Sequence, residues 1–578
     1  MCGSFLGRKS QETGSRLRAR SATDKTYAKI KIMKDPEYVP TIGLEIHAEI
    51  KTESKMFCSC KNDPDESRPN VNICPICLGH PGTLPVVNIR AVENVLRIGM
   101  AVNGTLADFT EWDRKHYFYP DIPKGYQISQ YAHPLVVGGV LSGVGLTRIH
   151  LEEDTARSTH DTHDHSLIDF NRSGIPLMEA VTEPVIHSSQ SAVVFAKEFQ
   201  LLLRTLGIGS ANLEKGEMRI EANVSVAKGE EEGRRKKELG RNKNTNVIPH
   251  TSLFIIPFSS LGTKIEIKNL NSFRAVGAAI EYEIARQIKV LEGGDKVIQE
   301  TRGWDEVRQE TYSQRSKESS PDYRYFPDPD IPKFFISSIP EFSPEILSQN
   351  MPEFPWIRRE RYKKDFSMTD KEITMFVEDP SLAEYFENII VSFKDDPRKI
   401  KLTVNYLLTD YLGMVMDTLS AVSAHLRQGY GGQAGGEATL PSEALSEGGV
   451  PPRGNGLNRK IFTHTNPIPV TYFSTLITMI AEGQLSSRGA KDALALMIKN
   501  PDQDPKTIAQ KHGLLQKSSV EDIAPIIEMV IKENPQVVDT YKSGKTASLQ
   551  YLIGQAMKVS GGSADPDIVK KLLIERMS

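Results

Sequence analysis

The chain has 578 residues, of which 39% are hydrophobic and 25% charged, so it holds enough apolar material for two to four domains of about 150 residues each. No run approaches the roughly 18 consecutive apolar residues of a membrane-spanning helix, so no membrane span is expected. The formal net charge of -3 argues against a protein that coats nucleic acid non-specifically, although a local basic face is compatible with it.

Residues 1–35 differ in composition from the rest of the chain. Lysines, arginines and serines dominate up to about residue 32, against only two acidic residues, Glu12 and Asp24, and there is no apolar stretch of the kind that a secretory signal needs. This composition excludes a secretory signal. It leaves two interpretations, an organellar transit segment and a disordered basic tail.

Residues 41–50 alternate without a break between apolar and polar side chains. A strand here places Ile42, Leu44, Ile46, Ala48 and Ile50 on one face, and Glu45, His47 and Glu49 on the other. The same pattern recurs at 148–152, 219–226 and 264–268. The polar faces of the first two carry Arg148, His150 and Glu152, and Arg219, Glu221, Asn223 and Ser225. One solvated strand face is ordinary in an antiparallel sheet. Four such strands in one sheet would gather carboxylates, imidazoles and cations on one surface, as a site for metal and phosphate requires.

Four of the five cysteines form two close pairs, Cys58 with Cys60 and Cys74 with Cys77. Two such pairs separated by a short loop are able to supply four thiolates to one tetrahedral zinc ion. The first pair has one intervening residue instead of two, which is the looser variant. Disulfide bonds are the alternative, but nothing indicates a secreted chain, so we expect structural zinc.

The segments that follow the cysteines predict further elements in chain order. We expect a helix over 88–102, a loop rich in aromatic and cationic residues over 113–130, and a Gly/Pro turn with two carboxylates within 167–183. Ser189 is the expected cap of a helix whose apolar side chains, from Val193 to Leu206, recur at helical spacing and belong to the core.

The second half of the chain differs in composition and in its predicted elements. Residues 227–246 read as a charged excursion between two strands. Residues 322–332 read as a rigid extended piece, in which aromatic rings alternate with an arginine and prolines fix the backbone. Helical segments follow, for example over 371–377 and 404–419. A low-complexity Gly-rich stretch comes next, and from residue 470 short amphipathic helices broken by Gly and Pro indicate a separate helical domain.

Ordered motifs along the chain closely resemble the B subunit of glutamyl-tRNA(Gln) or aspartyl-tRNA(Asn) amidotransferases, the GatB family. The matching motifs lie at 42–47, 85–88, 113–120, 150–154, 171–179, 267–273 and 322–327, and in the tail at 533–535 and 554–558. The resemblance runs from about residue 40 to the end of the chain.

The resemblance implies an α+β protein with a largely antiparallel-sheet catalytic (cradle) domain, a helical domain and a small all-α YqeY-like tail domain. We place the catalytic domain with its four-cysteine loop at 36–340 and the helical domain at 341–423. The Gly-rich linker or insertion follows at 424–465 and the tail domain at 466–578, where Lys542, Lys545 and Lys558 are candidate tRNA contacts.

The family resemblance further implies a ligase that uses ATP and Mg²⁺ to phosphorylate the glutamate side chain of misacylated Glu-tRNA(Gln), after which ammonia displaces the phosphate to give Gln-tRNA(Gln). The four clustered cysteines look committed to metal, which leaves no candidate nucleophile for glutamine hydrolysis, so the ammonia is expected to come from a partner. The implied partners are a GatA-like amidase subunit and a small GatC- or GatF-like subunit. With the basic N-terminal segment, this assignment predicts a location in the mitochondrial matrix.

Residue by residue, the resemblance places Mg²⁺ ligands at Glu45, His47, Glu152 and Glu179. It adds Arg157, where the family has a lysine, and Glu221, where the family has an aspartate, as catalytic side chains. Arginine keeps the charge of lysine but changes its reach. Within the matching motifs we expect ATP contacts from Lys268, Asn269 and Arg324, and structural zinc at Cys58, Cys60, Cys74 and Cys77. This chain also departs from the family by an insertion at 227–258 and by the Gly-rich stretch after residue 424. These insertions and the altered residues leave a second hypothesis, a tRNA-binding scaffold without catalytic activity. The intact Glu45, His47, Glu152 and Glu179 count against it.

Overall fold

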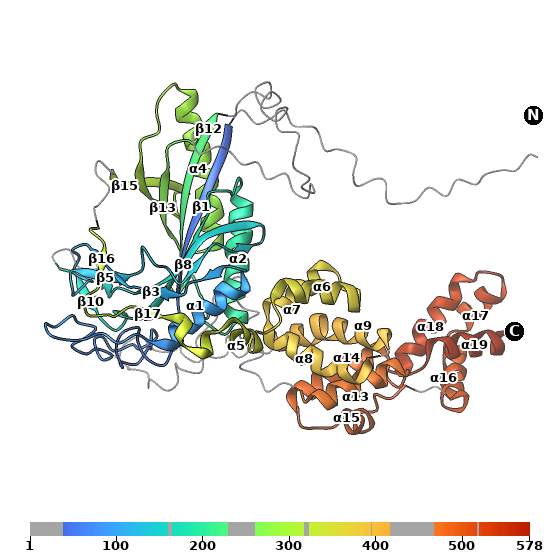
Figure 1. The fold of residues 1–578 in the computed structure, drawn as a ribbon. Helices are drawn as coiled ribbons and strands as arrows, with labels where there is room; N and C mark the ends of the chain where they lie inside the picture. The colour runs from blue at the N-terminus through green and yellow to red at the C-terminus, as the bar shows by residue number, and fades with distance from the viewer. Residues whose placement is uncertain are drawn as a thin grey trace, which may run out of the picture. The chain divides into compact units, whose positions relative to one another are not determined.

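A computed structural model describes residues 38–159, 165–228, 261–316, 323–394, 396–416, 468–516 and 519–578. The chain divides into two compact units, residues 1–350 and 351–578 (Figure 1). The predicted transit segment at 1–35, most of the charged excursion at 227–246 and the Gly-rich linker at 424–465 lie outside the described residues.

A ten-stranded sheet forms the centre of the first unit (Figure 1). Its middle runs in the order β13-β12-β1-β11-β8, with bounds Ile265–Leu270, Met218–Lys228, Tyr38–Glu49, Pro176–Thr182 and Val144–Glu153. Strands β14 (Glu300–Asp305) and β15 (Glu310–Ser316) extend one side, and β6 (Val136–Val137), β2 (Thr105–Leu106) and β7 (Val140–Leu141) extend the other. All pairings are antiparallel except β13 with β14. All four predicted strands are therefore confirmed, and they share one sheet.

The apolar face of this sheet is covered by two helices, α2 (Ser189–Thr205) and α4 (Phe273–Glu292), which contact each other as well as the sheet. The inward side chains of β1 from Ile42 to Ala48 are at most 1% exposed, as the alternation predicted. Ser188 and Ser272 cap the two helices by accepting hydrogen bonds from the backbone N–H groups of Ser191 and Ala275. The predicted cap at Ser189 was thus one residue late.

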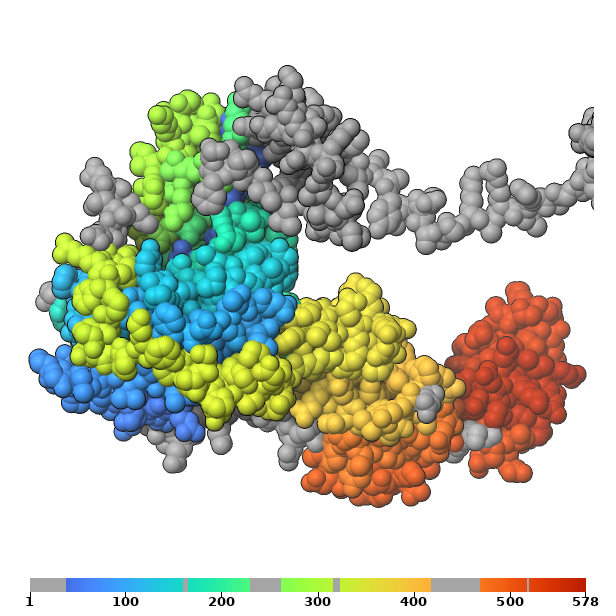
Figure 2. All heavy atoms as spheres, in the orientation of Figure 1, coloured from blue at the N-terminus to red at the C-terminus, as the bar shows by residue number. Residues whose placement is uncertain are grey.

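Two small sheets join aromatic segments that are far apart in the sequence. Residues predicted as a loop at 113–130 instead contain a hairpin, β4 (Asp113–His116) and β5 (Tyr126–Ser129). Strand β4 is polar throughout, so periodicity gave no signal for it. Strand β16 (Phe326–Pro327) pairs with β4, and β17 (Phe334–Phe335) pairs with β3 (Phe109–Thr110). Figure 2 shows this later segment in yellow-green lying over the blue residues near 110.

Three further elements complete the first unit. Helix α1 (Ile89–Ala101) agrees with the predicted helix and is capped by Asn88. Strands β9 (Arg157–Thr159) and β10 (Leu167–Asp169) form a separate pair, and α5 (Pro344–Gln349) is the last helix before the unit ends.

The second unit is helical in its described residues. It contains α6 (Pro355–Phe366), α7 (Asp370–Glu378), α8 (Pro380–Ile390), α9 (Pro397–Asn405), the π-helical turn η5 (Tyr406–Tyr411), α13 (Val470–Ala481), α14 (Ser487–Lys499) and α15 (Pro505–Lys511). Helices α16 (Val520–Glu533), α17 (Pro535–Lys542), α18 (Ala547–Val559) and α19 (Pro566–Met577) share one apolar core. Helix α13 contacts α8 and α9. The chain is α+β as predicted, and the finer boundaries at 341, 424 and 466 stay predictions.

None of the helices in the described ranges combines the length and the apolar character that crossing a bilayer requires.

The apolar face of β1 should dominate the stability of the first unit. Ile46 is completely buried, so we expect Ile46→Ala to reduce the free energy of unfolding by about 2–5 kcal/mol. The matched control is Ile298→Ala, since Ile298 is 74% exposed, and its effect should stay within about 0.5 kcal/mol. Urea unfolding followed by circular dichroism tests both variants, and equal midpoints would contradict this account of the core.

Candidate active site

Strand register brings the predicted polar side chains together on the polar face of the sheet, opposite helices α2 and α4. His47 of β1 is paired with Glu179 of β11, and Glu179 is paired in turn with His150 of β8. On the other side of β1, Glu45 is paired with Glu221 of β12. Because side chains of directly paired antiparallel residues point to the same face, these groups are neighbours in space.

The first group consists of His47, Glu152 and Glu179, whose possible ligand atoms all lie within 4.8 Å of one another. His47 Nε2 is 3.6 Å from Glu152 Oε1 and 3.3 Å from Glu179 Oε2. The Ser129 hydroxyl donates to Glu152 Oε2 at 3.0 Å. One imidazole and two carboxylates in this arrangement form a donor set that fits a divalent cation such as Mg²⁺ or Mn²⁺.

The electrostatics of this group follow from its burial. Burial alone would lower the pKa of His47, but the hydrogen bond to Glu179 and the negative charges of Glu179, Glu152 and Glu221 outweigh it and raise the pKa to about 9. Burial alone would raise the pKa of Glu179, but its two histidine neighbours lower it well below the usual value. In the metal-free protein, a proton on His47 therefore compensates part of the negative charge that a cation would compensate.

The second group surrounds Glu221 and Lys268. Lys268 Nζ lies 2.9 Å from Glu221 and 3.1 Å from Glu266. Glu45 accepts a hydrogen bond from Asn223 Nδ2 at 2.7 Å. Glu45 thus belongs to this second group and is not among the three residues whose ligand atoms converge. The predicted set of four Mg²⁺ ligands is split by the structure into a compact triad and a neighbouring residue.

A β-bulge shapes the second group. Ile220 pairs with Leu270 and Ala222 pairs with Ile267, so Glu221 alone faces both Lys268 and Asn269. Asn269 has a φ of 62°, in the left-handed region that asparagine tolerates better than most residues. Bulges commonly redirect a side chain at a functional site. Here the bulge lets Lys268 turn toward Glu221 at the margin of the polar face.

Two predicted residues are exposed, and two residues that were not predicted lie close to the triad. Arg157 is exposed at the start of β9, paired with Asp169 of β10, and Arg324 is exposed with a φ of 46°. The sequence reasoning did not select Lys115 or His150 as site residues. Burial alone would lower the pKa of Lys115, but the negative charges of Glu152 and Glu179 raise it. The alternation at 148–152 had placed His150 on the same polar strand face as Glu152. Lys115 lies in a segment predicted as a loop, where no alternation indicated its position.

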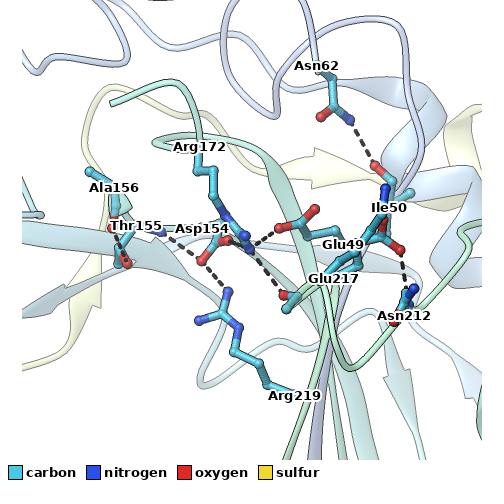
Figure 3. Close-up of polar contacts among 12 residues, drawn as sticks. Glu49, Ile50, Asn62, Asp154, Thr155, Ala156, Arg172, Asn212, Glu217 and Arg219 are labelled. Carbon is cyan, nitrogen blue, oxygen red and sulfur yellow. Dashed lines mark hydrogen bonds and ion pairs between the residues drawn. The ribbon is translucent and has the colours of Figure 1, made fainter. Parts of the chain in front are cut away.

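An ion-pair network braces the sheet beside the triad (Figure 3). Asp154 Oδ2 is 3.0 Å from Arg172, which also contacts Glu49, and Asp154 Oδ1 is 2.5 Å from Arg219. Burial would raise the pKa of Asp154, but Arg219 and Arg172 lower it. Arg219 is paired with His47 across β1 and β12. The network therefore ties the ends of β1, β8 and β12 together next to the candidate metal ligands.

The four predicted cysteine ligands converge, with their sulfur atoms within 4.8 Å of one another. A hydrogen bond from the Cys58 thiol lowers the pKa of Cys77 to about 5, and the buried Lys55, whose Nζ is 3.9 Å from Cys77 Sγ, acts in the same direction. Four sulfur atoms at this spacing fit one tetrahedral zinc ion with Zn–S bonds of about 2.3 Å. The loop also docks on the turn before β11, since Ser173 Oγ donates to the Cys77 carbonyl.

The raised pKa of His47 predicts a pH-dependent stability of the metal-free chain. Because the folded pKa of about 9 exceeds the ordinary value of 6.5, protonation of His47 stabilises the fold fully below about pH 6.5, and this contribution is lost as the pH rises through 9. We expect the difference in melting temperature between wild type and His47→Gln, measured by calorimetry in EDTA, to shrink over this range. A constant difference would contradict the assignment.

Comparison with known proteins finds matches to two domain models of one family. A family model for the GatB/GatE catalytic domain matches residues 40–339, and a second model, for the GatB domain, matches residues 455–577.

Relatives are similar over nearly their whole length. The B subunit of the aspartyl/glutamyl-tRNA(Asn/Gln) amidotransferase from Gloeothece citriformis is 35% identical over 561 residues, which cover 94% of this chain and 98% of the relative. The protein of the same name from Thermoanaerobacter pseudethanolicus is 34% identical over 552 residues, covering 94% of this chain and 100% of the relative. In Dehalococcoides mccartyi it is 35% identical over 553 residues, covering 93% and 98%. The chain that carries this polar sheet face and cysteine loop belongs to the GatB family.

Proposed function

We propose that this chain is the activating subunit of a glutamine-dependent tRNA amidotransferase, a carbon–nitrogen ligase that converts Glu-tRNA(Gln) to Gln-tRNA(Gln). The observation that carries the proposal is the convergence of His47, Glu152 and Glu179 on the polar face of the sheet. These residues lie within the part of the chain that matches the catalytic domain of the family. A merely structural sheet face would not need two buried carboxylates turned toward one imidazole.

The proposed reaction has two steps. An oxygen of the substrate's side-chain carboxylate attacks the γ-phosphorus of ATP, which forms an acyl phosphate and releases ADP. Ammonia then attacks the acyl carbon, phosphate leaves with the bonding electron pair, and the amide loses a proton. The first step is needed because a carboxylate is a poor acyl donor, whereas phosphate is a good leaving group.

The residues of the first group would hold Mg²⁺ through His47, Glu152 and Glu179, with Glu45 adjacent. When bound, Mg²⁺ supplies positive charge that neutralises the transferring phosphoryl group. Ser129 keeps Glu152 oriented through its hydroxyl, and Lys115 holds a positive charge beside Glu152 and Glu179. This charge is suited to orienting the substrate carboxylate for attack.

Lys268 and Asn269 are candidate ATP contacts at the other margin of the polar face. Lys268 is paired with Glu221 and Glu266 in the absence of ligand, so a phosphate would have to compete with these carboxylates for its ammonium group. Arg157 and Arg324 are exposed and would contribute only from outside the triad. We therefore propose that ATP binds near the bulge at Asn269 and that the substrate carboxylate binds near Lys115.

We propose that ammonia comes from a separate protein, because the four clustered thiols are suited to a metal and not to glutamine hydrolysis. We propose a GatA-like amidase and a small GatC- or GatF-like protein as partners. The relatives are each named as one subunit of an amidotransferase, which supports a multi-subunit enzyme. In the tail, Lys542, Lys545 and Lys558 are all exposed and available to tRNA phosphates. The basic residues before position 35 support a location in the mitochondrial matrix.

The proposal predicts that loss of either carboxylate abolishes amidation. We expect Glu152→Gln and Glu179→Gln to reduce the ATP-dependent formation of Gln-tRNA(Gln) at least about 100-fold, since each removes a charge needed for the metal but keeps the side-chain size. The assay uses this chain co-expressed with the amidase-like subunit of its organism, with glutamine and separately with free ammonia.

The matched control is Glu93→Gln, which neutralises a carboxylate of helix α1 that pairs with Arg90. Its activity should stay within about twofold of wild type. Product from ammonia alone would place the activation step in this chain. Binding of tRNA without ATP-dependent product in the wild-type complex would favour the scaffold hypothesis.

The cysteine cluster predicts a structural zinc ion, whose loss should loosen the loop at 58–77. We expect about one zinc ion per chain by atomic absorption, and Cys74→Ser should lower both the zinc content and the melting temperature. Cys2→Ser, which changes the cysteine that is not part of the cluster, should alter neither. A full zinc content in Cys74→Ser would overturn the assignment of Cys74.

A further inference from the structure

Glu179 is the one carboxylate of the triad that lies between two imidazoles. It is paired with His47 on β1 and with His150 on β8 in the same row of the sheet. The Nε2 atoms of both histidines lie 3.3 Å from the same oxygen, Glu179 Oε2. His47 also approaches Glu152, whereas His150 contacts the triad through Glu179.

The surroundings of His150 fix which of its nitrogens carries the proton. The side chain is 3% exposed, and Nδ1 is buried without a hydrogen-bond partner. A proton on Nδ1 would leave a buried donor unpaired and would turn the Nε2 lone pair toward a carboxylate oxygen, which is repulsive. A proton on Nε2 is donated to Glu179 and leaves only a lone pair unpaired. The contact therefore requires the tautomer with hydrogen on Nε2.

A ring nitrogen that carries this proton is not available to a metal ion. The convergent ligand atoms are those of His47, Glu152 and Glu179. In the row of paired residues, His150 lies on the opposite side of Glu179 from His47. Hydrogen bonds from such outer groups commonly hold a ligating carboxylate or imidazole in the orientation that binding needs. Without a second donor, the Glu179 carboxylate is free to rotate toward His47 alone.

We propose that His150 is a positioning residue, which donates its Nε2 proton to Glu179 and so holds that carboxylate in the orientation that binds the divalent cation. The inference rests on the proposed function, because it takes the triad as the cation site. It assigns a role to a side chain whose ion-pair contact is with Glu179. Removal of such an outer hydrogen bond typically weakens metal binding 10–100-fold.

The test measures binding of Mn²⁺ to the metal-stripped full chain without ATP or tRNA, from the electron paramagnetic resonance signal of free Mn²⁺. Three variants separate the donor from the bulk of the ring. The amide nitrogen of His150→Gln reaches the place of Nε2, that of His150→Asn reaches only the place of Nδ1, and His150→Phe has no donor. Glu152→Gln, which removes a ligand, identifies the signal that belongs to this site.

We expect His150→Gln to bind Mn²⁺ within about threefold of wild type, and His150→Asn and His150→Phe to bind it about 10–100-fold more weakly. The melting temperatures should not follow this order, since Gln and Asn are both polar replacements in the same buried position. His187→Phe is the control for loss of a histidine elsewhere in the unit, where the ring contacts the Pro40 carbonyl, and it should leave Mn²⁺ binding unchanged.

Two results would overturn the inference alone: wild-type affinity in His150→Phe, or an equal loss of affinity in His150→Gln and His150→Phe. A wild-type chain without any Mn²⁺ site sensitive to Glu152→Gln would overturn the assignment of the triad, and the inference with it. The failure of the inference and the failure of the proposed function are thus distinguishable in one titration series.

Discussion

The central strands of the sheet have to satisfy two environments at once, with helices α2 and α4 on one face and a largely buried set of charged side chains on the other. In β1 the residues from Ile42 to Ala48 that point to the helices are almost fully buried, and the residues between them include Glu45 and His47. Because the side-chain period of a strand is two, packing of the apolar face fixes the register of the polar face. The geometry of the candidate site is therefore held by the core, although the site residues repel one another.

Charges of opposite sign reduce this repulsion along the rows of the sheet. Glu179 lies between His150 and His47, Glu221 lies beside Lys268, and Asp154 lies between Arg172 and Arg219. A carboxylate that is removed from water needs such partners, since an uncompensated buried charge is strongly destabilising. The polar face is consequently organised before any ligand arrives, and a cation would replace the proton on His47.

Sequence alternation predicted which side chains share a face, but not which strands are neighbours. Strand β11 was missed because both of its faces are buried from Pro176 to Ala180, so it lacks the alternation of a half-exposed strand. Glu45 and His47 share a face, yet residues two apart on a strand are separated by about 6.6 Å, and Asn223 of the adjacent strand engages Glu45. The cysteine cluster was predictable because its ligands are close in sequence. The bulge at Asn269 and the approach of Lys115 depend on tertiary pairing, which a single sequence does not encode locally.

The order of the strands also has a consequence for how the protein is made. Glu45 and Asn223, which are hydrogen-bonded on adjacent strands, are 178 positions apart in the sequence. Contacts of such long range form slowly, since the entropy of closing the loop must be overcome first. On the ribosome, β1 emerges long before β11 and β12, the strands that flank it. A largely apolar strand with both edges unpaired is prone to aggregation, so the nascent chain should depend on chaperones until residue 228 has been synthesised.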